Sequence, residues 1–157
     1  MTTSLGTQPK DVTEIVRQLV EIDYDAIEGY SAAIDRLENE TFRDQLTSFK
    51  EDHQRHIADL GAELVSLGER VPSGPDLKGI VGKGKVVMGG FLGDLAILLA
   101  MKTNEEDSNE VYERAAERRD FPAPIRRLIE RGRADEQEHL AWIETQLSGF
   151  DTAATVD

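Results

Sequence analysis

The run from Ile125 to Leu147 constrains the fold most, because it reads as a long helix whose apolar face contains a carboxylate and an imidazole. At 3.6 residues per turn, the positions of that face are Ile125, Leu128, Gly132, Glu136, His139 and Ile143. Glu136 and His139 are three residues apart, so both side chains can reach one point inside a helical bundle. A metal ion is the simplest occupant of such a point.

Three other segments have the same helical periodicity. They cover residues 11–38, 41–67 and 94–118, and the fourth helix begins near Pro122. The residues predicted to cap the helices are Asp11, Asn39 or Thr41, Asp94 and Asp120. With no strand pattern between them, these segments predict an all-α protein built from four long helices.

Each predicted helix carries metal-binding residue types on its apolar stripe. They are Asp23 in the first helix, His53 and His56 in the second, Glu105 in the third, and Glu136 and His139 in the fourth. All three histidines of the chain belong to this set. If the third helix is rotated slightly, Glu106 or Asp107 could replace Glu105. Several unpaired charges inside a bundle would be costly, so a bound cation would relieve a large energetic penalty.

A weak internal repeat relates the first two helices to the last two. Asp23 precedes Tyr30 by seven residues, and Glu105 precedes Tyr112 by the same interval. The spacing from Asp23 to His53 also agrees, within one residue, with that from Glu105 to the glutamate of the fourth helix. The polar core positions of the two halves are therefore expected at the same depth in the bundle.

Residues 68–93 separate the two halves and are rich in glycine and proline. Antiparallel neighbouring helices need only a short loop, so this length predicts a partly helical crossover that runs along the bundle. The predicted organisation is a flexible tail at residues 1–10, a four-helix bundle at 11–149 and a second flexible tail at 150–157.

Composition narrows the classes of partner. The chain has 157 residues, enough for one domain with its own core, and no cysteine, which excludes disulfides and thiolate metal sites. A net charge of −13 argues against nucleic acid and anionic membranes as partners. No stretch approaches the ~20 apolar residues of a membrane span, and we expect a cytoplasmic protein. A second, moderately apolar face suggests a homodimer and consists of Ile15, Ile22, Ile34, Ile97 and Val111.

The pattern resembles the ferritin-like di-iron carboxylate superfamily, which includes bacterioferritin and rubrerythrin. Its members take one Glu from each of two helices and a Glu-x-x-His pair from each of the other two. The resemblance covers residues 11–148. Glu105 matches one lone carboxylate, and Glu136 with His139 match one pair. Asp23 stands at the other lone carboxylate and is one methylene shorter. The resemblance implies a ferritin-like four-helix bundle.

Within that superfamily, the chain looks closest to small bacterial four-helix proteins with Asp-x-x-Glu-Gly-Tyr in the first helix. This sequence has the motif at residues 25–30. By that resemblance, Tyr30 and Tyr112 would hydrogen-bond the ligating carboxylates.

The pair His53-x-x-His56 departs from the superfamily pattern, because His53 stands where a glutamate is expected. Paired glutamates bridge two ions and hold them ~3.5–4 Å apart, and an imidazole cannot bridge in that way. Two alternatives remain open. Either Glu136 bridges alone in a lopsided dinuclear site, or one ion is bound by a subset such as Glu105, Glu136, His139 and His53.

The resemblance implies iron as the cofactor, two ions if the site is dinuclear, with manganese or zinc also compatible with these ligands. The implied activity is that of a ferroxidase or peroxidase-type oxidoreductase, which oxidises ferrous iron or reduces peroxide in stress protection. Oxygen or peroxide would be its partner. The competing hypothesis is a metal-free or mononuclear bundle that acts as a structural or stress-related interaction protein.

Overall fold

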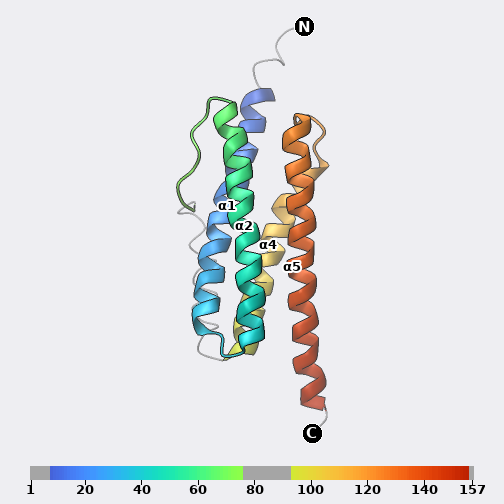
Figure 1. Ribbon diagram of the computed structural model, residues 1–157. Helices are drawn as coiled ribbons and strands as arrows, with labels where there is room; N and C mark the ends of the chain where they lie inside the picture. The colour runs from blue at the N-terminus through green and yellow to red at the C-terminus, as the bar shows by residue number, and fades with distance from the viewer. Residues whose placement is uncertain (1–7, 76–92, 156–157) are drawn as a thin grey trace.

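The computed structural model describes residues 8–75 and 93–155, and the side chains within 12–75 and 93–150. Four helices make up this part of the chain: α1 (Gln8–Arg36), α2 (Glu40–Ser66), α4 (Asp94–Glu117) and α5 (Ala123–Thr155). They lie side by side along one long axis (Figure 1). The predicted all-α four-helix bundle is confirmed. None of the described helices is long and apolar enough to cross a membrane.

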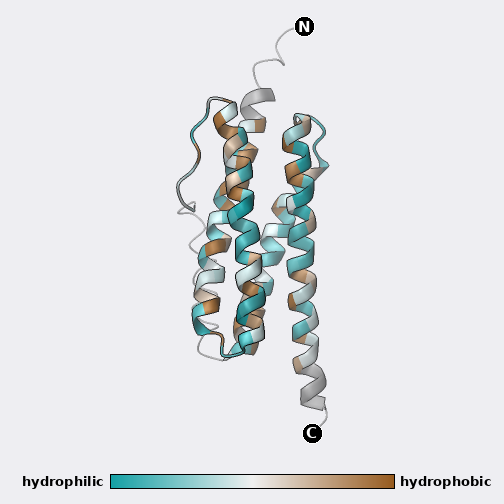
Figure 2. Cartoon of the chain, in the orientation of Figure 1, coloured by the Kyte–Doolittle hydropathy of each residue, from teal (hydrophilic) through white to brown (hydrophobic). Residues whose placement is uncertain are grey.

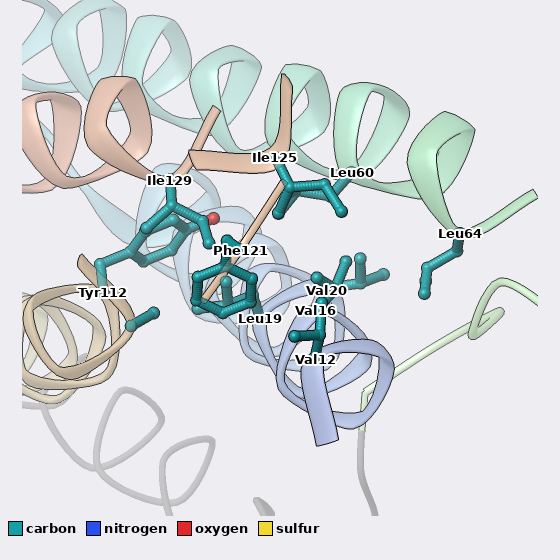
Figure 3. Close-up of a cluster of buried hydrophobic side chains, with 11 residues drawn as sticks. Val12, Val16, Leu19, Val20, Leu60, Leu64, Tyr112, Phe121, Ile125 and Ile129 are labelled. Atoms are coloured by element: carbon teal, nitrogen blue, oxygen red, sulfur yellow. The ribbon is translucent and has the colours of Figure 1, made fainter. Parts of the chain in front are cut away.

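The bundle core consists of two apolar clusters separated along the axis. One joins the first half of α1 to the end of α2, the end of α4 and the start of α5, and includes Leu19, Leu60 and Ile129 (Figure 3). The other lies towards the opposite end and includes Leu46, Met101 and Ile143. Hydrophilic and hydrophobic residues are interspersed along the helices in front, as expected for helices buried on one face (Figure 2). The polar stripe residues lie between the two clusters.

The α1–α2 turn is fixed by two side-chain caps. Asn39 is the N-cap of α2, as the sequence predicts, and its side chain accepts a hydrogen bond from the Phe42 amide at 3.0 Å. The prediction that Asp94 caps its own helix is wrong, because the N-cap of α4 is Gly93. The Asp94 carboxylate instead accepts hydrogen bonds from the amides of Glu38 at 2.9 Å and Asn39 at 3.0 Å. It therefore ties the start of α4 to the neighbouring turn.

Three other details differ from the sequence-based expectations. Helix α5 continues to Thr155, beyond the expected boundary at Gly149. Helical periodicity places Leu95 on the apolar stripe of the helix that starts at Asp94, but Leu95 is 41% exposed. Ile97, assigned to an outer face, is fully buried in the core. The other members of that face, such as Ile15 and Val111, are half-buried and pack against the core, so the homodimer remains a prediction. Most of the glycine-rich crossover lies outside the described residues.

Candidate metal centre

Six polar side chains from all four helices meet between the two apolar clusters. Each of them was singled out from the sequence, and none is more than 6% exposed: Asp23, His53, His56, Glu105, Glu136 and His139. Helical periodicity places them there, because each stands on the apolar stripe of its helix. Burial of so many ionisable groups is costly unless they are paired or bind a cation.

The six residues form two overlapping sets of potential metal ligands. The first comprises Asp23, His53, His56 and Glu136, and the second comprises His53, Glu105, Glu136 and His139. Within each set, one nitrogen or oxygen atom of each residue lies within 4.8 Å of the corresponding atoms of the others. His53 and Glu136 belong to both sets. The cluster therefore contains two groups of residues that could each hold a cation and that share an imidazole and a carboxylate.

Asp23 is the better satisfied of the two lone carboxylates. Its Oδ1 lies 2.8 Å from His53 Nδ1 and 3.1 Å from His56 Nδ1, and its Oδ2 accepts a 2.6 Å hydrogen bond from the Tyr112 hydroxyl. Glu105 receives the equivalent bond from the Tyr30 hydroxyl. The structure thus contains both tyrosine–carboxylate hydrogen bonds that the resemblance implies. Each joins the first half of the chain to the second.

Several buried donor and acceptor atoms in this cluster have no hydrogen-bond partner among the described residues. They are both carboxylate oxygens of Glu136, Glu105 Oε2, His53 Nε2 and His139 Nδ1. Native proteins leave few buried polar atoms unsatisfied, and each such atom requires an explanation. All of these atoms belong to the two ligand sets. A donor set of carboxylates and imidazoles, oriented inward and without partners, fits a transition-metal ion.

The charges of the cluster depend strongly on one another. Burial raises the pKa of Glu136 well above its ordinary value, and the nearby Glu105 and Asp23 carboxylates raise it further. Burial alone would also raise the pKa of Asp23, but its contacts with His53 and His56 bring the net shift below the ordinary value. Burial would likewise raise the pKa of Glu105, but its contacts with His139 and His53 bring that pKa below its ordinary value.

The histidine shifts are the counterpart of these carboxylate shifts. Burial lowers the pKa of His53, but the charge of Glu136 and the hydrogen bond with Asp23 outweigh it and raise the pKa well above the ordinary value. For His56, hydrogen bonds with Asp135 and Asp23 outweigh burial and raise the pKa. In the absence of metal, imidazolium groups therefore neutralise part of the buried negative charge.

A second layer of contacts holds two of the histidines and was not recognised in the sequence. His56 Nε2 lies 2.9 Å from Asp135 Oδ2, and His139 Nε2 lies 2.9 Å from Asp52 Oδ2. Arg55 donates to both aspartates, to Asp52 Oδ1 at 3.0 Å and to Asp135. Metal-bound histidines commonly donate their second ring N–H to a carboxylate in this way, which fixes the ring and its tautomer.

A signal for this layer does exist in the sequence. Asp52 directly precedes His53, and Asp135 directly precedes Glu136, so the same residue type occupies the same place in both halves of the repeat. The alternative ligands Glu106 and Asp107 are exposed. The helix register of α4 therefore places Glu105, and not its neighbours, in the cluster.

The model of a protein family described as a domain of unknown function, DUF2383, matches residues 11–118. The chain belongs to this family. The match ends before α5, the helix that contributes Glu136 and His139 to the cluster in this DUF2383 protein.

A solved structure is similar to this DUF2383 protein over most of both chains. It is described as a crystal structure of ferritin-like, diiron-carboxylate proteins from Bacillus anthracis str. Ames. The TM-score is 0.68 at 17% sequence identity, and the alignment covers 89% of this chain and 97% of the other. The likeness shows that the fold is a ferritin-like four-helix bundle. No curated protein matches the chain.

Proposed function

We propose that the protein binds two ions of non-haem iron at the buried cluster and uses them to oxidise ferrous iron or reduce peroxide in stress protection. The observation that carries the proposal is the set of buried, inward-facing ligand atoms without hydrogen-bond partners among the described residues. The similarity to a ferritin-like, diiron-carboxylate protein supports iron as the metal. The same donor types also suit manganese and zinc.

The proposed roles follow from position. Asp23 and His56 would hold the first ion, Glu105 and His139 would hold the second, and Glu136 belongs to both ligand sets. Bound iron would supply the one-electron chemistry that carboxylates and imidazoles lack. The two tyrosine hydroxyls hold the terminal carboxylates in place, with Tyr112 bonded to Asp23 and Tyr30 to Glu105.

Asp52 and Asp135 contribute by fixing the histidine tautomers. Each accepts from the Nε2–H of one histidine, so Nδ1 of His139 and of His56 faces the cluster and is the nitrogen left to bind an ion. Arg55 joins the two aspartates and couples the orientation of both rings. The apolar clusters on either side exclude bulk water, which strengthens electrostatic interactions within the site.

The first test is elemental analysis of protein purified without a metal-affinity tag and supplied with ferrous iron in the absence of oxygen. We expect about two irons per chain, and then faster ferrous oxidation in air than in buffer alone. The double variant Glu136→Ala/His139→Ala should lose both metal and activity. A matched double variant at exposed positions of the same helix, Gln137→Ala/Glu138→Ala, should retain both. Absence of iron from the wild-type chain would overturn the proposal.

A metal-free structural bundle is the second candidate, and one observation favours it. Asp23 lies within hydrogen-bond distance of both His53 and His56, so part of the cluster is already charge-compensated by side chains alone. This candidate predicts that thermal unfolding is unchanged by ferrous iron or by a chelator. A mononuclear site instead predicts one ion per chain and no oxygen-dependent turnover.

A further inference from the structure

His53 differs from the other two histidines of the cluster because both of its ring nitrogens face inward. The ring is fully buried, and its centre lies 5.5 Å from that of His56 and 5.2 Å from that of His139. His56 and His139 each use Nε2 to contact an outer aspartate, which leaves only Nδ1 for the cluster. The imidazole of His53 therefore occupies the middle of the site.

The two nitrogens of His53 face different carboxylates. Nδ1 lies 2.8 Å from Asp23 Oδ1 and 3.4 Å from Glu136 Oε1. Nε2 lies 3.5 Å from Glu105 Oε1 and has no hydrogen-bond partner among the described side chains. Asp23 belongs to the first ligand set and Glu105 to the second. The ring thus spans the two sets, with one nitrogen directed at each.

We propose that His53 is a bridging ligand that binds one ion through Nδ1 and the other through Nε2. This inference rests on the proposed function, since it requires two ions. Binding at both nitrogens releases every ring N–H proton of His53 to solvent, two of them from the imidazolium of the metal-free protein, and leaves an imidazolate with a single negative charge. The negative charge replaces that of the glutamate expected at this position.

Bridging through a ring has a structural consequence. The lone pairs of the two imidazole nitrogens point away from each other on different sides of the ring. The two oxygens of a glutamate, in contrast, belong to one carboxylate and can both face the same small gap. Two ions bridged by this ring would therefore lie farther apart than the ~3.5–4 Å typical of two-metal sites. Glu136, which also belongs to both sets, spans the same gap as a carboxylate.

Proton NMR of the Co²⁺-loaded, full-length wild-type protein tests the bridge without a variant. The paramagnetic ion shifts the exchangeable ring N–H protons of coordinated histidines out of the normal spectrum. His56 and His139 each retain an Nε2–H bonded to an aspartate, whereas a bridging His53 retains none. We expect two shifted, exchangeable signals that disappear in deuterated water. A third such signal, from a ring N–H on His53, would overturn the proposal.

Stepwise Co²⁺ titration, followed by visible absorption, supplies an independent readout. His56→Ala should weaken one binding step and His139→Ala the other. His53→Ala should weaken both steps, each by more than ~10-fold, since even outer-layer changes at metal sites cost 10–100-fold. Loss of a single step in His53→Ala, with the other unchanged, contradicts the bridge but leaves the proposed metal function standing. Failure of the wild-type chain to bind any Co²⁺ or Fe²⁺ contradicts both.

Discussion

Tyr30 and Tyr112 exchange hydrogen bonds between the two halves of the chain. Tyr30 of α1 donates to Glu105 of α4, and Tyr112 of α4 donates to Asp23 of α1. Both hydroxyls are fully buried, and burial together with the neighbouring carboxylates raises the pKa of each tyrosine well above its ordinary value. The tyrosines therefore remain protonated donors throughout the physiological range. A carboxylate that loses such a donor keeps its charge in a buried site with one hydrogen bond fewer.

Tyr112→Phe should accordingly lower the free energy of unfolding of the metal-free protein by about 1.5–3 kcal/mol, the range for hydrogen bonds to charged groups. Urea denaturation monitored by circular dichroism measures the change. Tyr24→Phe is the matched control, because Tyr24 is half-buried against the first apolar cluster and does not belong to the polar cluster. We expect a change within about 0.5 kcal/mol. Equal effects of the two substitutions would show that the hydroxyl of Tyr112 contributes nothing specific.

At the scale of the helix, α5 approaches α4 closely at Gly132. A Cβ atom at this position would overlap Cε1 of the Tyr112 ring. The glycine is therefore required by packing, although glycine is a poor helix former. Its absent side chain lets Tyr112 lie against α5 and reach Asp23.

Gly132→Ala should destabilise the protein by about 1–3 kcal/mol through overpacking, despite the better helix propensity of alanine. Gly149→Ala, in the same helix, should change the free energy of unfolding in the opposite direction, because no atom lies within 4 Å of a Cβ built there. That variant should be stabilised by up to about 1 kcal/mol. Thermal unfolding of both variants gives the comparison, and destabilisation of the Gly149 variant by a similar amount would contradict this account.

Periodicity explains why so much of the element-level structure could be predicted from the sequence. A residue on the apolar stripe, such as His53 or Glu136, must face the core whatever the neighbouring helices are. Asp52 and Asp135 are on the flank of that stripe, and their direction depends on how α2 and α5 pair. The sequence interpretation therefore missed them. Asp94 was misassigned for the same reason, since its partners belong to another helix turn.

For the whole molecule, the buried charges predict how stability depends on pH without metal. The lowered pKa values of Asp23 and Glu105 contribute stability that is lost as pH falls below their ordinary values of 3.8 and 4.5. His53 and His56 have raised pKa values, so their protonated forms stabilise the fold. This contribution is complete below the ordinary histidine pKa of 6.5 and is lost as pH rises through the raised values. The pKa of Glu136 is raised above 4.5, so ionisation of this carboxyl also destabilises the fold as pH increases.

We therefore expect the urea midpoint of the metal-free protein to be highest at mildly acidic pH, near the interval from 4.5 to 6.5, and to decrease towards alkaline pH. Bound metal should move the maximum to higher pH, because ligands must lose their protons to bind. Midpoints measured from pH 4 to pH 9, with and without a chelator, check both statements. A metal-free midpoint that rises between pH 6 and pH 9 would contradict the assignment of charges.

Glu136→Gln should weaken metal binding without weakening the metal-free fold. Burial and the neighbouring carboxylates favour the neutral form of Glu136, and glutamine mimics that form, so the metal-free variant should be as stable as the wild type or more stable at neutral pH. With ferrous iron at 100 times its dissociation constant, the wild type should gain about 2.7 kcal/mol for each bound ion, whereas the variant should gain little. Glu138→Gln, which removes an exposed charge two residues away, should keep the full gain. Anaerobic urea titrations with and without iron measure all three, and an iron-dependent gain retained in Glu136→Gln would place the bound ion elsewhere.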